Sequence, residues 1–201
     1  MNRNIIAILR GITPGEASDV GEAILDAGIS NIEVPLNSPQ AFESIEILAS
    51  QFADEALIGA GTVLTVDEAR TVRQAGGEFV VSPNCDVDVI AETEAQGMLS
   101  FPGVFTATEC FTAIKAGANG LKIFPAFQMG TEGLKALCAV LPDEIPLYAV
   151  GGVGPENFAH WFAAGAYGFG IGSALYSPGK GAEEVAKTAR NIVEAYDKAA
   201  K

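Results

Sequence analysis

Lys122 lies in the middle of an apolar stretch, Gly120–Pro125, that is typical of a short buried strand closed by a proline. Side chains alternate between the two faces of a strand, so Lys122 and Phe124 are expected on the same face. A buried ammonium group is costly, which leaves two interpretations. Either the lysine stem lies along an edge strand with its amine in water, or low polarity lowers the pKa of the amine. In the second case a neutral amine can attack a carbonyl carbon.

Glu33 occupies a second apolar run, Asn31–Pro35, with its aliphatic neighbours expected on the opposite face. It can be a general acid and base beside an amine, because forming an imine and protonating a carbon chain both require proton transfers. The structural alternative is an ion pair with Arg10 or Lys122, since buried charges are usually paired. Both interpretations place the carboxylate inside the fold.

Repeated strand and helix signals indicate how these residues are positioned. Helical patterns end in glycine, and most are followed by a short apolar run and a new helix start. The sequence predicts eight strands, Ile5–Leu9, Asn31–Pro35, Leu57–Gly61, Phe79–Ser82, Leu99–Pro102, Gly120–Phe124, Pro146–Val150 and Tyr167–Ile171. Such apolar strands suit a parallel sheet covered on both faces. We therefore predict an α/β fold, a single-domain (β/α)8 TIM barrel over residues 1–201, with an open doubly wound sheet as the alternative.

Two kinds of sequence mark the helix starts. Thr-x-x-Glu capping boxes begin at Thr13, Thr65 and Thr106. Pro39 and Pro155 are each predicted as the first residue of a helix. The last helix is expected to bury one apolar face, made of Val185, Ala189, Ile192, Val193 and Tyr196.

In a (β/α)8 barrel the functional groups gather where the strands end. That rule brings a cation at Arg10, the carboxylate of Glu33, a hydroxyl at Thr62 and the amine of Lys122 to one mouth of the barrel. Pro83 follows the fourth strand and is expected at the same edge. These residue types together favour carbonyl chemistry over a purely structural role for Lys122.

Two glycine-rich segments, Val150–Pro155 and Gly168–Ser173, follow the seventh and eighth strands. Phosphate sites in this fold are often built there from backbone N–H groups and a short helix N-terminus. Residues 173–176 are expected to be that short helix. The alternative is that the glycines only permit tight turns or close packing.

Composition excludes several classes of partner. The 12 Lys and Arg residues against 25 Asp and Glu residues give a net charge of −13, so neither nucleic acid nor an anionic membrane is an expected partner. Three widely spaced cysteines match neither a zinc site nor a disulfide framework. We expect no metal, no cofactor, no membrane span and a cytoplasmic protein.

The motifs, taken in order, extend over nearly the whole chain: Ala7-Ile8-Leu9-Arg10-Gly11-Ile12-Thr13-Pro14, Ile32-Glu33-Val34-Pro35-Leu36-Asn37-Ser38, Ile58-Gly59-Ala60-Gly61-Thr62-Val63-Leu64, Ser82-Pro83-Asn84, Lys122-Ile123-Phe124-Pro125 and Val150-Gly151-Gly152-Val153. With these motifs the chain resembles the 2-keto-3-deoxy-6-phosphogluconate/6-phosphogalactonate aldolases, class I lyases that have a TIM barrel and are usually homotrimers. The resemblance implies a phosphorylated keto-acid sugar and pyruvate as ligands.

The resemblance also implies roles for individual residues. Lys122 would form the Schiff base and Glu33 would shuttle protons. Substrate binding would fall to Arg10 and Thr62 at the pyruvate carboxylate, to Pro83, Phe124 and Val150 along the pocket, and to Gly151, Gly152, Gly172 and Ser173 at the phosphate.

Two departures from the phosphogluconate pattern indicate the phosphogalactonate branch. Pro35–Ser38 stands where phosphogluconate aldolases tend to have Thr-Leu-Arg-Thr, and Val150 stands where they tend to have threonine. A valine cannot hydrogen-bond the C4 hydroxyl of one epimer. The expected activity is therefore cleavage of 2-dehydro-3-deoxy-6-phosphogalactonate to pyruvate and glyceraldehyde 3-phosphate. The alternatives are a phosphogluconate aldolase of mixed epimer specificity and a non-catalytic phosphosugar-binding barrel.

Overall fold

Strands and helices alternate along the chain, and the strands join one sheet. A computed structural model describes residues 3–201. The strands are β1 (Ile5–Ile8), β2 (Asn31–Pro35), β3 (Leu57–Gly61), β4 (Phe79–Val81), β5 (Leu99–Phe101), β6 (Gly103–Val104), β7 (Leu121–Ile123), β8 (Leu147–Val150) and β9 (Gly168–Ile171). The helices are α1 (Pro14–Asp26), α2 (Ala41–Phe52), α3 (Val66–Gln74), α4 (Val87–Ala95), α5 (Ala107–Lys115), α6 (Ala126–Cys138), α7 (Phe158–Ala163) and α8 (Ala182–Ala199).

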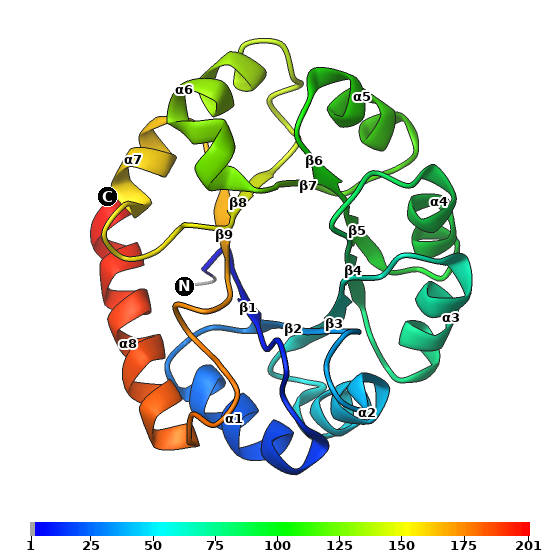
Figure 1. The fold of residues 1–201 in the computed structure, drawn as a ribbon, viewed down its shortest axis with the longest axis vertical. Helices are drawn as coiled ribbons and strands as arrows, with labels where there is room; N and C mark the ends of the chain where they lie inside the picture. The colour runs from blue at the N-terminus through cyan, green and yellow to red at the C-terminus, as the bar shows by residue number, and fades with distance from the viewer. Residues whose placement is uncertain (1–2) are drawn as a thin grey trace.

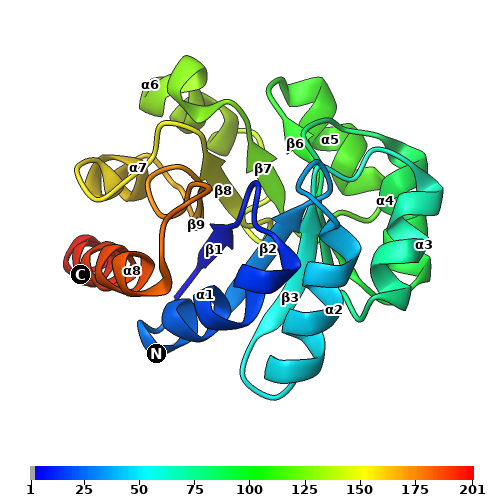
Figure 2. The same cartoon turned by 60° about the horizontal axis from the view of Figure 1, so that its bottom comes forward.

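The sheet closes on itself as a barrel. Its strand order is β5-β4-β3-β2-β1-β9-β8-β7-β6, and every pairing is parallel. The two ends of this order are consecutive in the chain, so the ring is completed through Pro102. Figure 1 looks into the ring of strands with the helices outside it, and Figure 2 shows the same arrangement tilted. The chain is a (β/α)8 barrel, and the open-sheet alternative is wrong.

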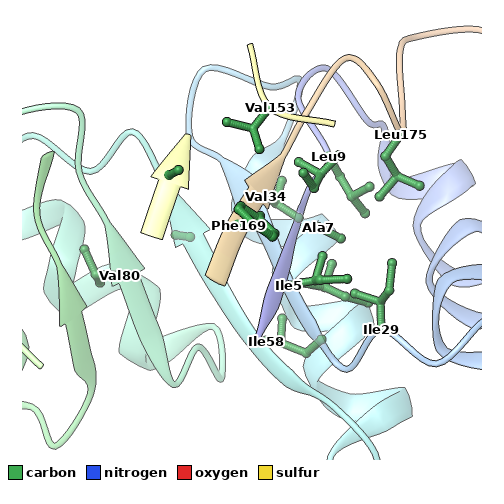
Figure 3. Packing of buried hydrophobic residues seen from close by; sticks show 14 of the residues in the cluster. Ile5, Ala7, Leu9, Ile29, Val34, Ile58, Val80, Val153, Phe169 and Leu175 are labelled. Carbon is green, nitrogen blue, oxygen red and sulfur yellow. The ribbon is translucent and has the colours of Figure 1, made fainter. Parts of the chain in front are cut away.

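Two apolar layers follow from the alternation of side chains along each strand. On β1, Ile5 and Ala7 face outward into the layer between strands and helices, whereas Ile6 and Ile8 face the barrel interior. Figure 3 shows the outer layer around β1. Phe169 of β9 stacks on Phe158 of α7 in that layer, with ring centroids 4.5 Å apart. Both faces of the sheet are buried, which explains the nearly continuous apolar character of the strands.

The three predicted capping boxes start α1, α3 and α5. In α3, the Thr65 Oγ1 accepts a hydrogen bond from the Glu68 N–H, and the Glu68 carboxylate accepts one from the Thr65 N–H. On α8, Val185, Ala189, Ile192 and Tyr196 are buried as expected, with Val193 partly buried. Each helix thus begins at a defined residue after the barrel mouth.

The fifth predicted strand, Leu99–Pro102, is observed as β5, and a short strand that was not predicted, β6, follows Pro102. Pro102 has no N–H to donate to the sheet, so the ladder is interrupted at this residue. Its carbonyl still accepts a hydrogen bond from the Lys122 N–H at 2.9 Å. The barrel therefore has nine short strands at eight positions within residues 3–201.

The helix starts predicted at Pro39 and Pro155 are wrong, because both prolines lie in turns. The α2 helix begins two residues after Pro39, and the Ser38 Oγ accepts from the Gly11 N–H instead of capping a helix. Likewise α7 begins after Asn157, whose backbone N–H closes a turn onto the Gly154 carbonyl. In residues 3–201, no helix combines the length and apolar character needed to cross a membrane.

Candidate active site

The barrel interior is apolar except where two ionisable side chains enter it. Phe79, Phe101 and Tyr148 contact one another edge to face inside the ring. In the sheet register, Glu33 lies opposite Ile8 and Gly59, and Lys122 lies opposite Gly103 and Tyr148. The carboxylate and the amine therefore enter the same interior from well-separated strands.

Glu33 is only 1% exposed, and its Oε2 has no hydrogen-bond partner in the structure. Burial raises the pKa of Glu33 from 4.5 to about 7, although the positive charges of Lys122 and Arg10 oppose that rise. Gly61 makes room for this carboxylate, because a Cβ at Gly61 would overlap it. Glu33 is thus a carboxyl group that can both hold and release a proton near neutral pH.

Lys122 is 5% exposed. Burial lowers its pKa, as does the charge of Arg10, while the Glu33 carboxylate favours the protonated form. The Lys122 Nζ lies 4.5 Å from the centroid of the Phe124 ring, so the two share one face as predicted. The edge-strand interpretation fails, because β7 lies between β6 and β8 and the lysine is buried.

No ion pair within 4.0 Å joins Glu33 to Lys122 or Arg10 in the described part of the chain. The charges of Lys122 and Arg10 still act on the pKa of Glu33, and those of Glu33 and Arg10 act on the pKa of Lys122. The structural alternative, in which Glu33 is only an ion-pair partner, therefore has no contact to support it. The carboxylate stays available for a ligand.

A cavity of about 790 Å³ opens at the ends of the strands. It is lined by every residue that the sequence suggested for substrate binding: Arg10, Thr62, Pro83, Phe124, Val150, Gly151, Gly152, Gly172 and Ser173. Lys122 lies against Phe124 in its wall, and Glu33 pairs with Ile8, which also lines the cavity. Neither Lys122 nor Glu33 lines the cavity itself, so both reach this ligand-sized space only through these neighbouring residues.

The backbone around this cavity turns sharply. Thr62 has φ 58°, a left-handed conformation that is unfavourable for a β-branched residue. Gly151 and Gly152, with φ 95° and 71°, turn the chain after β8. The Asn157 Nδ2 donates to the Gly152 carbonyl at 3.0 Å and holds this turn. Glycine is required at both positions, so the tight-turn interpretation holds in addition to any ligand contact.

The short helix expected at residues 173–176 is absent. The Leu175 and Tyr176 N–H groups both donate to the Gly172 carbonyl, which makes a single turn. Pro178 follows closely and disfavours a helical conformation for the residue before it. Any phosphate at this wall would meet turn N–H groups and the Ser173 hydroxyl, without a helix N-terminus.

The described residues contain no group of three His, Cys, Asp or Glu side chains placed to hold a metal ion. The polar side chains that line the cavity are Arg10, Thr62, Glu156, Ser173, Tyr176 and Ser177. Together with the buried lysine and glutamate, they suit the binding of an anionic carbonyl compound and attack on it by an amine.

The comparisons with known proteins agree with this chemistry. The family model described as KDPG and KHG aldolase matches residues 1–190. The chain belongs to this aldolase family. It is 48% identical to a 2-dehydro-3-deoxy-6-phosphogalactonate aldolase from Escherichia coli (strain K12), over 97% of this chain and 95% of that one.

More distant relatives of the aldolase carry a different substrate name. A 2-dehydro-3-deoxy-phosphogluconate aldolase from Treponema pallidum is 33% identical over 74% of this chain and 70% of its own. Among solved structures, one described as native KDPGal matches with a TM-score of 0.98 and 47% identity, covering 100% of this chain and 97% of that one. The fold of the aldolase is therefore that of a known carbon–carbon lyase.

Some site residues of the aldolase were not singled out from the sequence. Glu156 and Tyr176 line the cavity, and Asn37 contacts the Arg10 side chain. Glu156 follows the glycine-rich turn after β8, which was a usable signal. Asn37 belongs to the motif after β2, but its contact with β1 depends on how two loops meet in space.

Proposed function

We propose that this aldolase cleaves 2-dehydro-3-deoxy-6-phosphogalactonate to pyruvate and glyceraldehyde 3-phosphate through an imine on Lys122. The observation that carries the proposal is the buried Lys122 amine, which shares the barrel interior with Glu33, whose Oε2 has no hydrogen-bond partner among the described residues. Burial lowers the pKa of Lys122 and so increases the share of neutral amine, the form that can attack a ketone.

The proposed reaction uses Glu33 as the proton carrier. The Lys122 amine adds to the C2 ketone, and loss of water from the carbinolamine leaves an iminium ion. Glu33 takes the proton of the C4 hydroxyl while the C3–C4 bond breaks and glyceraldehyde 3-phosphate is released. The electron pair of the C3–C4 bond moves into the iminium ion and forms an enamine. Protonation of the enamine at C3 and addition of water then release pyruvate and restore the free lysine.

In this proposal, different residues of the cavity bind the carboxylate end and the phosphate end of the substrate. Arg10 and Thr62 bind the carboxylate end, where a guanidinium offers several N–H donors. The opposite wall binds the phosphate through backbone N–H groups near Gly151, Gly152, Gly172 and Ser173. Pro83 and Phe124 form the surface between the two ends. All of these residues line one cavity, which supports the division.

Epimer preference is assigned to Val150, which lines the cavity and has no hydroxyl to offer the C4 position. The ratio of kcat/KM for the two C4 epimers of the substrate measures this preference. We expect the phosphogalactonate epimer to be preferred, and Val150→Thr to shift the ratio toward phosphogluconate about tenfold or more. Equal kcat/KM values in the native enzyme would favour the mixed-specificity alternative.

Borohydride reduction in the presence of pyruvate tests the imine directly. We expect a reduced pyruvyl adduct in the intact mass, located on Lys122 by peptide mapping and missing from Lys122→Met. The matched control is Lys115→Met. Lys115 is exposed at the C-terminal end of α5, so this variant should still form the adduct. Binding of pyruvate without any adduct would favour a binding-only barrel.

We also propose a cytoplasmic homotrimer. The large apolar side chains Phe105, Phe127 and Val140 are exposed near α5 and α6, with Phe127 at 64%. Contact between copies would remove such surface from water. The three cysteines are free thiols, as a reducing compartment favours. Native mass spectrometry measures the assembly, and a monomer at micromolar concentration would contradict the trimer.

A further inference from the structure

Asn37 and Ser38 follow β2 in a turn, and both side chains contact the segment that follows β1. The Asn37 Oδ1 accepts a hydrogen bond from the Arg10 Nη1 at 2.7 Å. The Ser38 Oγ accepts one from the Gly11 N–H at 2.8 Å, and Ser38 is only 7% exposed. The turn thus contacts both the side chain of Arg10 and the backbone immediately after it.

Backbone hydrogen bonds hold this turn on two sides. The Leu36 N–H donates to the Gly61 carbonyl at 2.7 Å, immediately before Thr62. The Ser38 N–H donates to the Pro35 carbonyl at 2.9 Å and closes the turn. Asn37 lies between these two anchored residues. Its backbone is therefore fixed relative to β2 and β3, the strands that carry Glu33 and lead into Thr62.

Arg10 requires such a partner to be held in one position. Its side chain is exposed, and no ion pair within 4.0 Å involves it in residues 3–201. A free arginine side chain loses rotamer entropy when it binds a ligand. A hydrogen bond that orders it before binding reduces that cost.

We propose that Asn37 is a positioning residue for the aldolase reaction: it holds the Arg10 guanidinium over the cavity, ready for the substrate carboxylate. Ser38 supports it by fixing the backbone at Gly11. The inference rests on the carboxylate-binding role given to Arg10 under the proposed function. It adds that carboxylate binding by Arg10 depends on the uncharged side chain of Asn37 in the neighbouring loop.

A double-mutant cycle of Asn37→Leu and Arg10→Ala tests the inference, with kcat, KM and the melting temperature measured for each protein. Asn37→Leu keeps the approximate side-chain size and removes the acceptor. We expect its KM to rise about fivefold to tenfold with kcat changed less than twofold, because a binding contact is lost. In the Arg10→Ala background the same change should alter KM less than twofold. Asn191→Leu, at an exposed position of α8, is the matched control and should leave both constants unchanged.

The possible failures are distinguishable. If Arg10→Ala leaves KM unchanged, the role of Arg10 in the proposed function is wrong and the inference falls with it. If Arg10→Ala raises KM but Asn37→Leu does not, only the role of Asn37 is overturned. An equal rise in KM in both backgrounds also overturns it, because Asn37 would then act without Arg10. A shared loss of kcat and melting temperature would indicate a structural role and contradict positioning.

Discussion

At the scale of single residues, the Glu33–Lys122 pair is defined by burial without direct contact. The Glu33 Oε2 has no hydrogen-bond partner within residues 3–201, and the Lys122 amine lies over the Phe124 ring. Burial raises the pKa of the acid and lowers that of the amine, so each is moved toward its neutral form. The proposed chemistry requires a carboxyl group that exchanges protons near pH 7 and an amine with an increased neutral share.

The pH dependence of kcat/KM follows from these shifts. Raising the pH ionises Glu33 and favours the neutral Lys122 amine, so we expect kcat/KM to rise with pH through about 7. Glu33→Gln should lose that step and reduce kcat by about 10²- to 10⁴-fold. Steady-state kinetics from pH 5.5 to 8.5 measure both. A native profile that is flat across pH 7 would contradict the raised pKa of Glu33.

Ionisation of Glu33 should lower the folding stability, although it raises kcat/KM. Since the pKa of Glu33 is about 7 when folded and near 4.5 when unfolded, the folded state binds more protons between those values. Native stability therefore decreases, relative to Glu33→Gln, as pH rises from about 4.5 to 7, by on the order of 3 kcal/mol. Urea unfolding of both proteins at pH 5 and pH 7.5 measures the difference. A difference independent of pH would contradict this prediction.

At the scale of elements, glycines in the strands leave space for large side chains inside the barrel. Gly59 leaves room for the Phe79 ring, and Gly61 leaves room for the Glu33 carboxylate. Gly172 differs, because a Cβ there would meet Ile8 only at an ordinary 3.8 Å and its φ is not positive. Packing therefore does not require glycine at position 172, although the residue lines the cavity.

Gly172→Ala tests whether the cavity residues near Gly172 bind the phosphate, and it should not destabilise the fold. We expect an unchanged melting temperature and a KM for the phosphorylated substrate raised about tenfold, because the methyl group enters the cavity. Formation of the reduced pyruvyl adduct, which needs no phosphate, should continue. Gly15→Ala in α1, where a Cβ would meet nothing within 4 Å, is the matched control. Loss of the pyruvate adduct would contradict the assignment of this wall to phosphate.

At the scale of the whole molecule, side-chain contacts join the segment before β1 to α8. The Arg3 Nε and Nη2 donate to the two carboxylate oxygens of Asp197 in α8, at 2.8 and 2.7 Å. The Tyr196 hydroxyl accepts a hydrogen bond from the Asn4 N–H. These contacts fasten α8 to the start of β1, and none of the four residues lines the cavity.

Asp197→Ala should therefore weaken the fold without touching the reaction. The pair is partly exposed, so we expect a loss of about 0.5–1 kcal/mol in unfolding free energy, smaller at high salt. Both kcat and KM should stay within twofold of the native values. Urea unfolding at low and high salt, with parallel kinetics, measures this. A large loss of activity at unchanged stability would contradict the prediction that the Arg3–Asp197 contact affects stability and not catalysis.

Much of the fold could be predicted from local sequence. Capping boxes at Thr13, Thr65 and Thr106 are short-range patterns, so α1, α3 and α5 begin where predicted. Strands such as Asn31–Pro35 and Leu57–Gly61 match their predicted bounds because glycine, proline and polar residues flank them. The helix starts predicted at Pro39 and Pro155 are wrong because the Ser38 side chain bonds to Gly11 and the Asn157 side chain bonds to Gly152 within its own turn.

The sequence by itself determined the residue types at the barrel mouth, because parallel strands deliver their carboxyl ends to one edge. Only the tertiary structure decided that Glu33 is unpaired, that its pKa is raised and that Asn37 contacts Arg10. The reason is physical: desolvation and hydrogen bonding depend on what neighbouring strands and loops place within a few ångströms. Those neighbours are distant in the chain, and no local pattern encodes them.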